Sequence, residues 1–278
     1  MQIEPSGQAC GARITGLDLS RPLSEPDIAA IRAAWLEHLV LSFPDQRLDD
    51  DALERFTLAF GHFGEDPFIA PIPGRRHVIA VQRAADETAP IFAEAWHTDW
   101  SFQALPPDGT CLYGITIPPQ GGDTLFANQR LALAEMPEGL RKRLDGVMAV
   151  HSARAGYAPD GIYGESDQKS GRSMDIRPSE EARAVQRHPL VRVHPETGQP
   201  ALYGAPGYIV ALEGTPEAEA LMMELYQWQT QERFQYRHHW EPNMLVMWDN
   251  RATLHRATGG YAGHARLLHR TTIGGSVF

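Results

Sequence analysis

A histidine and an aspartate two positions apart, His97 and Asp99 in AEAWHTDWSF, are the first residues whose types and spacing suggest metal chemistry. Side chains of a strand alternate between its faces, so residues two apart in this β-prone segment would point to the same side. Two such donors can share one metal ion. A 2-His-1-carboxylate triad needs a second imidazole and leaves coordination positions open for a bidentate cosubstrate and dioxygen. His255, which follows the apolar strand LVMW in MWDNRATLHRA, is the candidate third ligand.

Residue types alone leave other interpretations of this triad open. The chain has 12 histidines, so a His-x-Asp pair can arise by chance, and rival donors to His255 are His188, His194, His238, His239, His264 and His269. A zinc ion in the same triad could activate water for hydrolysis, although zinc sites usually have more histidine ligands. A triad retained only for packing would instead belong to a non-catalytic jelly-roll protein that binds a metabolite.

The elements around these residues are expected to be mixed at the N-terminus and mainly β after residue 70. A capping serine predicts a helix over 24–39, a buried strand follows at 40–46, and 49–64 predicts a second amphipathic helix. A short edge strand is expected within 9–24. Apolar runs separated by Pro and Gly predict further strands at 77–83, 109–119, 123–128, 189–198, 201–205 and 243–250. Helical insertions are expected at 128–147 and 215–234.

This order of elements predicts one domain over residues 1–278, mainly β with flanking α-helices. The best match is a jelly roll, the double-stranded β-helix of cupin-like proteins, because it brings distant strands side by side. The segment 155–187 is polar and rich in Gly and Ser, so we expect a long loop there, placed as an active-site loop or lid.

Composition narrows the possible functions. A formal net charge of −10 with scattered Lys and Arg argues against nucleic-acid binding. No run reaches the roughly 18 apolar residues of a membrane span, and the N-terminus lacks the pattern of an export signal. The two cysteines, Cys10 and Cys111, are too few for a disulfide framework. We therefore expect a cytoplasmic protein with no membrane partner.

The chain resembles the family of taurine dioxygenase and the 2,4-dichlorophenoxyacetate dioxygenases over nearly its whole length. The segments that carry the resemblance are ITGLDLSRPLS, WHTDWSF, GGDTLFAN, HPLVRVHPETG, WDNRATLHRA and RLLHRTTI. In that family a His-x-Asp pair and a distant His bind Fe(II), and an arginine follows the last ligand. Here Arg266 and Arg270 follow His255 by 11 and 15 residues (266 − 255 = 11 and 270 − 255 = 15). The resemblance implies that His97, Asp99 and His255 hold Fe(II).

The resemblance also implies a place for 2-oxoglutarate, which would be the cosubstrate together with dioxygen. Thr124 and Arg266 match the positions that hold its distal carboxylate, where a guanidinium fork and a hydroxyl donor suit the chemistry. Arg270 matches the arginine that holds the substrate sulfonate in taurine dioxygenase. Two arginines four apart in RLLHRTT would share one face of a strand. Trp248 is expected beside the iron site.

The substrate pocket departs from the family pattern. Asp66 stands in place of a histidine that contacts the sulfonate, and Ile69 in place of a tyrosine. Ala93 replaces an asparagine near the substrate amine, while Tyr157 and Tyr208 replace two phenylalanines of the pocket wall. Because the Asp66 carboxylate would repel an anion, we expect it to turn away or to meet a cationic part of the substrate.

The resemblance therefore implies an oxidoreductase that hydroxylates a small anionic organic substrate while 2-oxoglutarate becomes succinate. The first expectation is an alkylsulfonate resembling taurine, which would release sulfite and an aldehyde. An aryloxyalkanoate or an alkyl sulfate ester is the alternative. A homo-oligomer, either dimer or tetramer, is also expected because such assemblies are common in the family.

Overall fold

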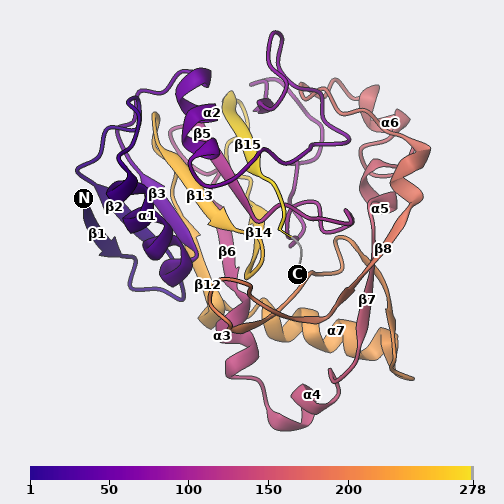
Figure 1. Cartoon of the computed structure of the whole chain (residues 1–278). Coiled ribbons are helices and arrows are strands. Elements are labelled where there is room, and N and C mark those ends of the chain that lie inside the picture. Colours follow the sequence, from indigo (N-terminus) through magenta and orange to yellow (C-terminus); the bar gives the residue numbers. More distant parts are fainter. Residues whose placement is uncertain (277–278) are drawn as a thin grey trace.

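Two facing β-sheets form the centre of the computed structural model, which describes residues 1–276 (Figure 1). The larger sheet has seven strands in the order β1-β2-β3-β13-β5-β15-β4. Neighbouring strands are antiparallel except for the parallel pair β2 and β3. The strands of this sheet are β1 Gln2–Pro5, β2 Ala12–Thr15, β3 Val40–Phe43, β4 Ile79–Arg83, β5 Gly109–Thr116, β13 Leu245–Asp249 and β15 Arg266–Ile273.

The smaller facing sheet has the order β12-β6-β14. Its strands are β6 Thr124–Asn128, β12 Gln235–His238 and β14 Thr253–Ala257. Phe126 of the smaller sheet packs on Trp248 of the larger one, with ring centroids 5.5 Å apart. Leu112 and Leu268 of the larger sheet belong to the same buried cluster. The predicted jelly-roll core, mainly β with flanking helices, is confirmed.

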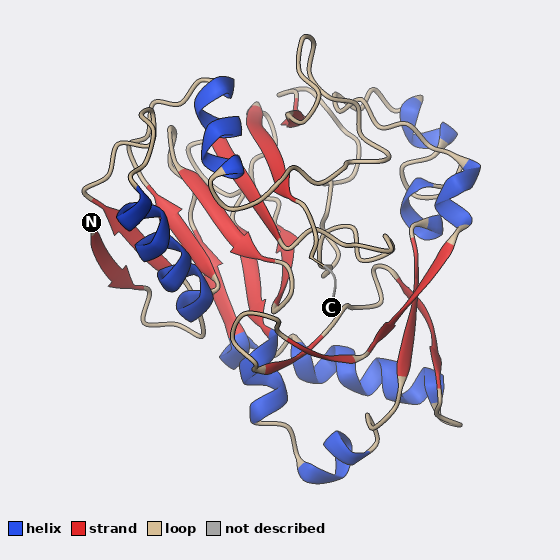
Figure 2. Ribbon diagram, viewed as in Figure 1, coloured by secondary structure: helices blue, strands red, loops and turns tan. Residues whose placement is uncertain are grey.

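Two helices cover the outer face of the seven-stranded sheet (Figure 2). Both lie within the helical segments predicted at 24–39 and 49–64. They are α1 (Glu25–His38) and α2 (Asp50–Leu58). The Ser24 side chain accepts a hydrogen bond from the first turn of α1, and Asp49 does the same for α2, which satisfies N–H groups that have no partner within the helix. Trp35 on α1 is fully buried against this sheet.

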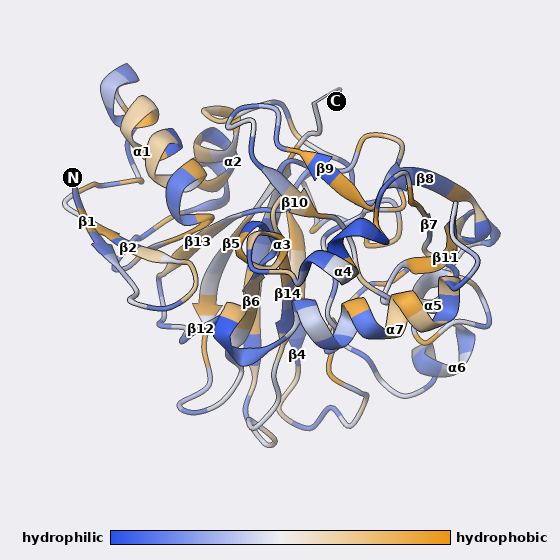
Figure 3. Ribbon diagram, turned by 90° about the horizontal axis from the view of Figure 1, so that it is seen from below, coloured by the Kyte–Doolittle hydropathy of each residue, from blue (hydrophilic) through white to orange (hydrophobic). Residues whose placement is uncertain are grey.

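A second group of strands and helices extends the molecule beyond the sandwich. Its strands are β7 Met148–Ser152, β8 Val185–Pro189, β9 Val191–Val193, β10 Pro200–Leu202 and β11 Ile209–Glu213. Its helices are α3 Gln129–Ala134, α4 Glu138–Lys142, α7 Ala218–Gln229 and the short 3₁₀ helix η2 Glu232–Phe234. Helix α7 carries hydrophobic and hydrophilic residues (Figure 3), and its Leu221 and Leu225 join the buried cluster under these strands. A helical insertion was predicted at 215–234, and α7 lies within that range.

Two predictions about local structure are wrong. The single helix expected at 128–147 is divided into α3 and α4 because Pro137, which has no N–H and disfavours helical backbone before it, begins the second helix. The strand near residue 12 is not an edge strand, since β1 pairs with β2 and takes the edge position.

No helix within the described residues 1–276 combines the length and the apolar character that crossing a membrane would require.

The segment 155–187 contains short helices rather than one continuous loop. These are α5 (Arg154–Tyr157), α6 (Glu165–Gln168) and the 3₁₀ helix η1 (Glu180–Arg183). Arg172 forms a buried ion pair with Asp167, and the Glu87 carboxylate accepts hydrogen bonds from the backbone and hydroxyl of Ser173, at 2.9 and 2.6 Å. The first contact lies within the segment, and the contacts with Glu87 join the segment to the loop after β4.

A buried charge network joins β13 to the β9–β10 pair. The Asp249 carboxylate accepts hydrogen bonds from Arg251 and lies 2.9 Å from His194 Nε2, and Arg251 also contacts Glu196 at 2.8 Å. Burial alone would raise the pKa of Asp249, but Arg251 and His194 outweigh it and lower that pKa to about 2. The anion is therefore the form that stabilises this part of the fold.

We expect this network to make stability depend on acid pH. An unfolded aspartate has a pKa of about 3.9, so Asp249 contributes roughly 2 to 3 kcal/mol that is fully present above about pH 5 and is lost as pH falls through about 4 towards 2. The substitution Asp249→Asn should remove this contribution. At neutral pH it should cost roughly 3 kcal/mol, because Arg251 loses its fully buried anionic partner, although it keeps its contact with the less buried Glu196. Urea denaturation of both proteins across this pH range tests the expectation, and two parallel stability curves would contradict it.

Candidate active site

The backbone brings the three predicted metal ligands together in a way that the sequence did not indicate. His97 and Asp99 lie in a loop rather than on the expected strand, and His255 lies on β14 rather than at the exit of β13. His97 and His255 form an isolated antiparallel bridge. Each backbone N–H donates to the carbonyl of the other, at 3.0 and 2.8 Å. This pair of hydrogen bonds holds the loop against the strand.

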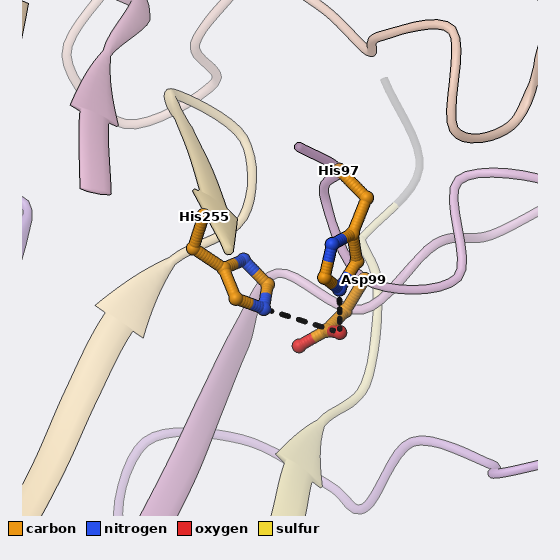
Figure 4. Close-up of side chains that lie close together, drawn as sticks. All are labelled: His97, Asp99 and His255. Carbon is orange, nitrogen blue, oxygen red and sulfur yellow. Dashed lines mark ion pairs between the residues drawn. The ribbon is translucent and has the colours of Figure 1, made fainter. Parts of the chain in front are cut away.

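The three side chains point toward one another (Figure 4). Nε2 of His97 and Nε2 of His255 each lie 3.7 Å from Oδ1 of Asp99, and all three side chains are buried. One potential ligand atom from each residue falls within 4.8 Å of the others. His97 Nδ1 contacts the Ala95 carbonyl at 2.9 Å, and Asp99 Oδ2 accepts a hydrogen bond from Thr110 at 2.6 Å. Such outer contacts orient metal ligands.

The protonation states of these groups suit a metal ion. Burial lowers the pKa of His97, and burial followed by the neighbouring His97 lowers the pKa of His255 to about 3. Burial opposes ionisation of Asp99, but His255, Arg270 and His97 outweigh it, so the pKa of this carboxyl is lowered. Two neutral imidazoles and a carboxylate are the donors of a 2-His-1-carboxylate iron site. The residues present therefore fit Fe(II).

A cavity of about 60 Å³ lies between the two sheets beside the triad. Its wall combines the side chains of both sheets, and it includes Val81, Leu112, Thr124, Trp248, His255, Ala257, Arg266 and Arg270. The guanidinium of Arg266 donates to the Gly122 carbonyl at 3.3 Å, while its Nε has no partner in residues 1–276. Thr124 Oγ1 accepts from Trp240 Nε1 at 3.0 Å and can still donate its own hydrogen. A cation and a hydroxyl at one end suit a carboxylate.

A second cavity of about 310 Å³ also reaches the triad, and its wall is largely aromatic. It is lined by His97, Asp99 and Arg270 together with Phe92, Ala93, Trp96, Trp100, Tyr157, Ile162, Tyr163, Tyr208 and Tyr226. The segment 155–187 supplies several of these residues. Tyr208 also packs edge-on against the His97 ring, with centroids 5.9 Å apart. A mostly apolar cavity with a few polar groups is typical of a small-molecule site.

The residues predicted for the substrate pocket fall into two groups. Ala93, Tyr157 and Tyr208 line the large cavity, and Ala93 also lines the small one. Ile69 lines neither cavity. It is 3% exposed and forms an isolated bridge with Ile176 inside a hydrophobic cluster, so its role in the substrate pocket stays a prediction.

Asp66 pairs with a cation of the protein itself. Its carboxylate forms an ion pair with Arg270. The Trp100 Nε1 also donates to the same carboxylate, at 2.8 Å. The reason is local: Arg270 is buried, and a buried cation is stable when an anion pairs with it. Arg270 lines both cavities, but Asp66 lines neither.

Several residues of the site were not predicted. Trp100 stacks on the Arg270 guanidinium, with 4.9 Å from the guanidinium carbon to the ring centroid, and Thr110 orients Asp99. Tyr163 and Phe92 pack together in the wall of the large cavity, 5.1 Å between centroids. The position of Trp100 directly after Asp99 was a usable signal, whereas nothing in the sequence linked Thr110 to the triad.

Known proteins are similar to this chain in sequence and in fold. Residues 2–272 match the family described as taurine catabolism dioxygenase TauD, TfdA family. The chain is 32% identical over 289 residues to the alpha-ketoglutarate-dependent sulfate ester dioxygenase of Pseudomonas putida, covering 100% of this chain and 90% of that protein. It is also 32% identical over 280 residues to the alpha-ketoglutarate-dependent 2,4-dichlorophenoxyacetate dioxygenase of Cupriavidus pinatubonensis, covering 94% and 93%.

The comparison with solved structures identifies the same group of dioxygenases. A solved taurine dioxygenase from Burkholderia xenovorans superposes with a TM-score of 0.82 at 33% sequence identity, and the match covers 99% of this chain and 90% of that chain. The sequence matches and the structural match extend over nearly the whole chain, and the donor set beside the small cavity fits iron. The protein belongs to the taurine catabolism dioxygenase TauD, TfdA family and is a 2-oxoglutarate-dependent dioxygenase that uses Fe(II) and dioxygen.

Proposed function

We propose that His97, Asp99 and His255 bind the iron and that Arg266 and Thr124 bind the distal carboxylate of 2-oxoglutarate in the small cavity. The observation that supports this assignment is the meeting of both cavities at the triad, with Arg266 in the small cavity only. Fe(II), with 2-oxoglutarate and dioxygen, supplies the oxidant, and 2-oxoglutarate leaves as succinate and carbon dioxide. The side chains of both sheets that line the small cavity would orient the cosubstrate, which is how a protein assists such chemistry.

The large cavity is the proposed substrate site. Its aromatic wall would hold an alkyl or aryl group, and Arg270 would contact the polar end of the substrate beside the iron. One oxygen atom of dioxygen would be inserted into a C–H bond of the substrate. The resulting hydroxyl group would lie on the carbon next to an ether or ester oxygen. The product is a hemiacetal-type adduct, which breaks its second C–O bond to give a carbonyl compound and the free phenol, alcohol or sulfate.

An aryloxyalkyl compound or a sulfate ester fits this site better than taurine. The sulfate ester and 2,4-dichlorophenoxyacetate dioxygenases named above act on substrates of these types. Taurine would place a bare ammonium among Tyr157, Tyr163 and Tyr208, where burial of a cation without a carboxylate partner is unfavourable. Alkylsulfonates with a longer hydrophobic chain are the second candidate, because they replace that ammonium with an apolar tail.

We expect hexanesulfonate and phenoxyacetate to give kcat/KM values at least about tenfold higher than taurine. Each methylene group buried in an apolar site contributes about 0.8 kcal/mol, so a few of them suffice for this ratio. Hexanesulfonate and phenoxyacetate are anions, whereas taurine carries an ammonium as well as its sulfonate. The comparison therefore tests whether the aromatic wall prefers an apolar group to an ammonium. Succinate formation by the Fe(II)-loaded enzyme is the measurement. A tenfold advantage for taurine would exclude the proposed substrate class.

A cytoplasmic location and a homo-oligomeric state are also part of this proposal. Cys10 and Cys111 are both free and buried, which is compatible with a reducing compartment. The homo-oligomer rests on the family resemblance. The proposal keeps residues 1–278 as one domain, with 155–187 as its active-site lid. Light scattering of the purified protein gives the oligomeric state directly.

A further inference from the structure

The Arg270 guanidinium is enclosed by negative groups before any substrate binds. Its side chain is 6% exposed. Nη2 forms the ion pair with Asp66, Nη1 lies 3.8 Å from the Asp99 carboxylate, and the Trp100 ring covers its flat face. An arginine side chain stays protonated in proteins, so Arg270 is a permanent cation whose charge Asp66 already balances.

Asp66 is fixed in this position. Its side chain is 7% exposed, and Oδ1 accepts hydrogen bonds from both Arg270 and the Trp100 indole. An anionic substrate at Arg270 would either displace Asp66 from its partner or lie close to a buried carboxylate of like charge. Both arrangements are unfavourable, because a buried charge that loses its partner is costly and like charges at short distance repel.

Arg270 nevertheless keeps a free donor. Its Nε has no hydrogen-bond partner within the described part of the chain, and the residue lines both cavities. A buried N–H without a partner favours a ligand that supplies an acceptor atom. An uncharged acceptor, such as an amide carbonyl, satisfies this donor without placing another anion beside Asp66.

We propose that Asp66 is a specificity-determining residue that makes the Arg270 subsite electrically neutral, so that the enzyme selects substrates whose polar end is an uncharged hydrogen-bond acceptor, such as a carboxamide. This inference rests on the proposed function and narrows its substrate class to aryloxyalkyl compounds with an uncharged polar end, so that sulfate esters and alkylsulfonates become the weaker substrates. Asp66 itself touches no substrate atom. It acts through Arg270, by occupying the guanidinium that an anion would otherwise pair with.

Phenoxyacetamide and phenoxyacetate form a matched pair of probes for this proposal, because they have nearly the same shape and differ by one charge. Calorimetry would measure their binding to the enzyme loaded with Fe(II) and 2-oxoglutarate, without oxygen. The wild-type enzyme should bind phenoxyacetamide at least about tenfold more tightly. Asp66→Asn keeps the size of the side chain and removes its charge, so this variant should bind phenoxyacetate at least about tenfold more tightly than wild type does.

The matched control is Glu65→Gln, which removes the charge of an exposed neighbour that does not contact Arg270 in the described structure. It should leave both affinities unchanged. Asp66→Ser provides a second variant if Asp66→Asn does not fold, as judged by circular dichroism and thermal melting. Tighter binding of phenoxyacetate than of phenoxyacetamide by wild type overturns the inference, whatever the variants do. An equal gain in the Glu65→Gln control would also overturn it, because the effect would then come from net charge.

Failure of the proposed function gives a different result. If neither probe binds wild type or Asp66→Asn, then the large cavity does not accept aryloxy compounds and both proposals fall. If phenoxyacetate binds wild type more tightly and supports succinate formation, the proposed function stands and only the role of Asp66 is rejected.

Discussion

Replacement of His255 by alanine is expected to reduce Fe(II)-dependent succinate formation by at least about 100-fold. Loss of an outer partner of a metal ligand typically costs about 10- to 100-fold, and His255 is itself a proposed ligand. The protein should remain folded, because the backbone bridge between His97 and His255 does not involve the imidazole. Equilibrium dialysis against Fe(II) gives a second measurement that does not depend on turnover.

Two further variants test whether the loss of activity is specific to the proposed iron ligands. His264→Ala removes an exposed imidazole and should leave activity and iron binding unchanged. Thr110→Val removes the hydroxyl that donates to Asp99, and it should cause an intermediate loss. Near-native activity in His255→Ala would rule out this triad, and one of the other histidines would then have to supply the donor.

Replacement of Arg266 by alanine should weaken 2-oxoglutarate binding by roughly 2 to 5 kcal/mol, which corresponds to a factor of about 30 or more. The variant would leave the distal carboxylate buried beside Thr124 without a cation. Arg266→Lys keeps the charge but loses the planar fork, so its affinity should lie between those of the wild type and Arg266→Ala. Calorimetric titration of 2-oxoglutarate into the iron-loaded protein measures the effect without turnover.

Arg237→Ala is the control for this series, because Arg237 is an exposed arginine that pairs with Asp123 at the surface. It should bind 2-oxoglutarate as wild type does. An unchanged dissociation constant in Arg266→Ala would move the cosubstrate role to another cation, and Arg270 is the arginine that also lines the small cavity.

The sequence predicted the parts of the site that follow from strand periodicity. Arg266 and Arg270 are four residues apart on β15, and because side chains alternate along a strand both lie buried on the same face of the sheet. The helix capped by Ser24 followed from local chemistry in the same way. Such features depend on neighbours in the chain, so the pattern of residue types is enough to predict them.

The other features of the site depend on contacts between segments that are distant in the sequence. The same-face argument for His97 and Asp99 assumed a strand, yet these residues converge from a loop that a single bridge to β14 holds in place. The pairing of Asp66 with Arg270 joins residues 204 positions apart. A pattern of residue types contains no information on which loop reaches which strand, so only the folded structure could show that Asp66 neutralises the arginine assigned to the substrate.

The bridge between His97 and His255 has a consequence for how the enzyme is made in the cell. His255 lies 158 residues after His97 (255 − 97 = 158). During synthesis the ribosome therefore produces the His-x-Asp pair long before the third donor exists. A growing or truncated chain that ends before β14 has only two of the three donors and cannot assemble the proposed iron site. Redox-active iron would thus be captured at this triad only after synthesis has passed β14.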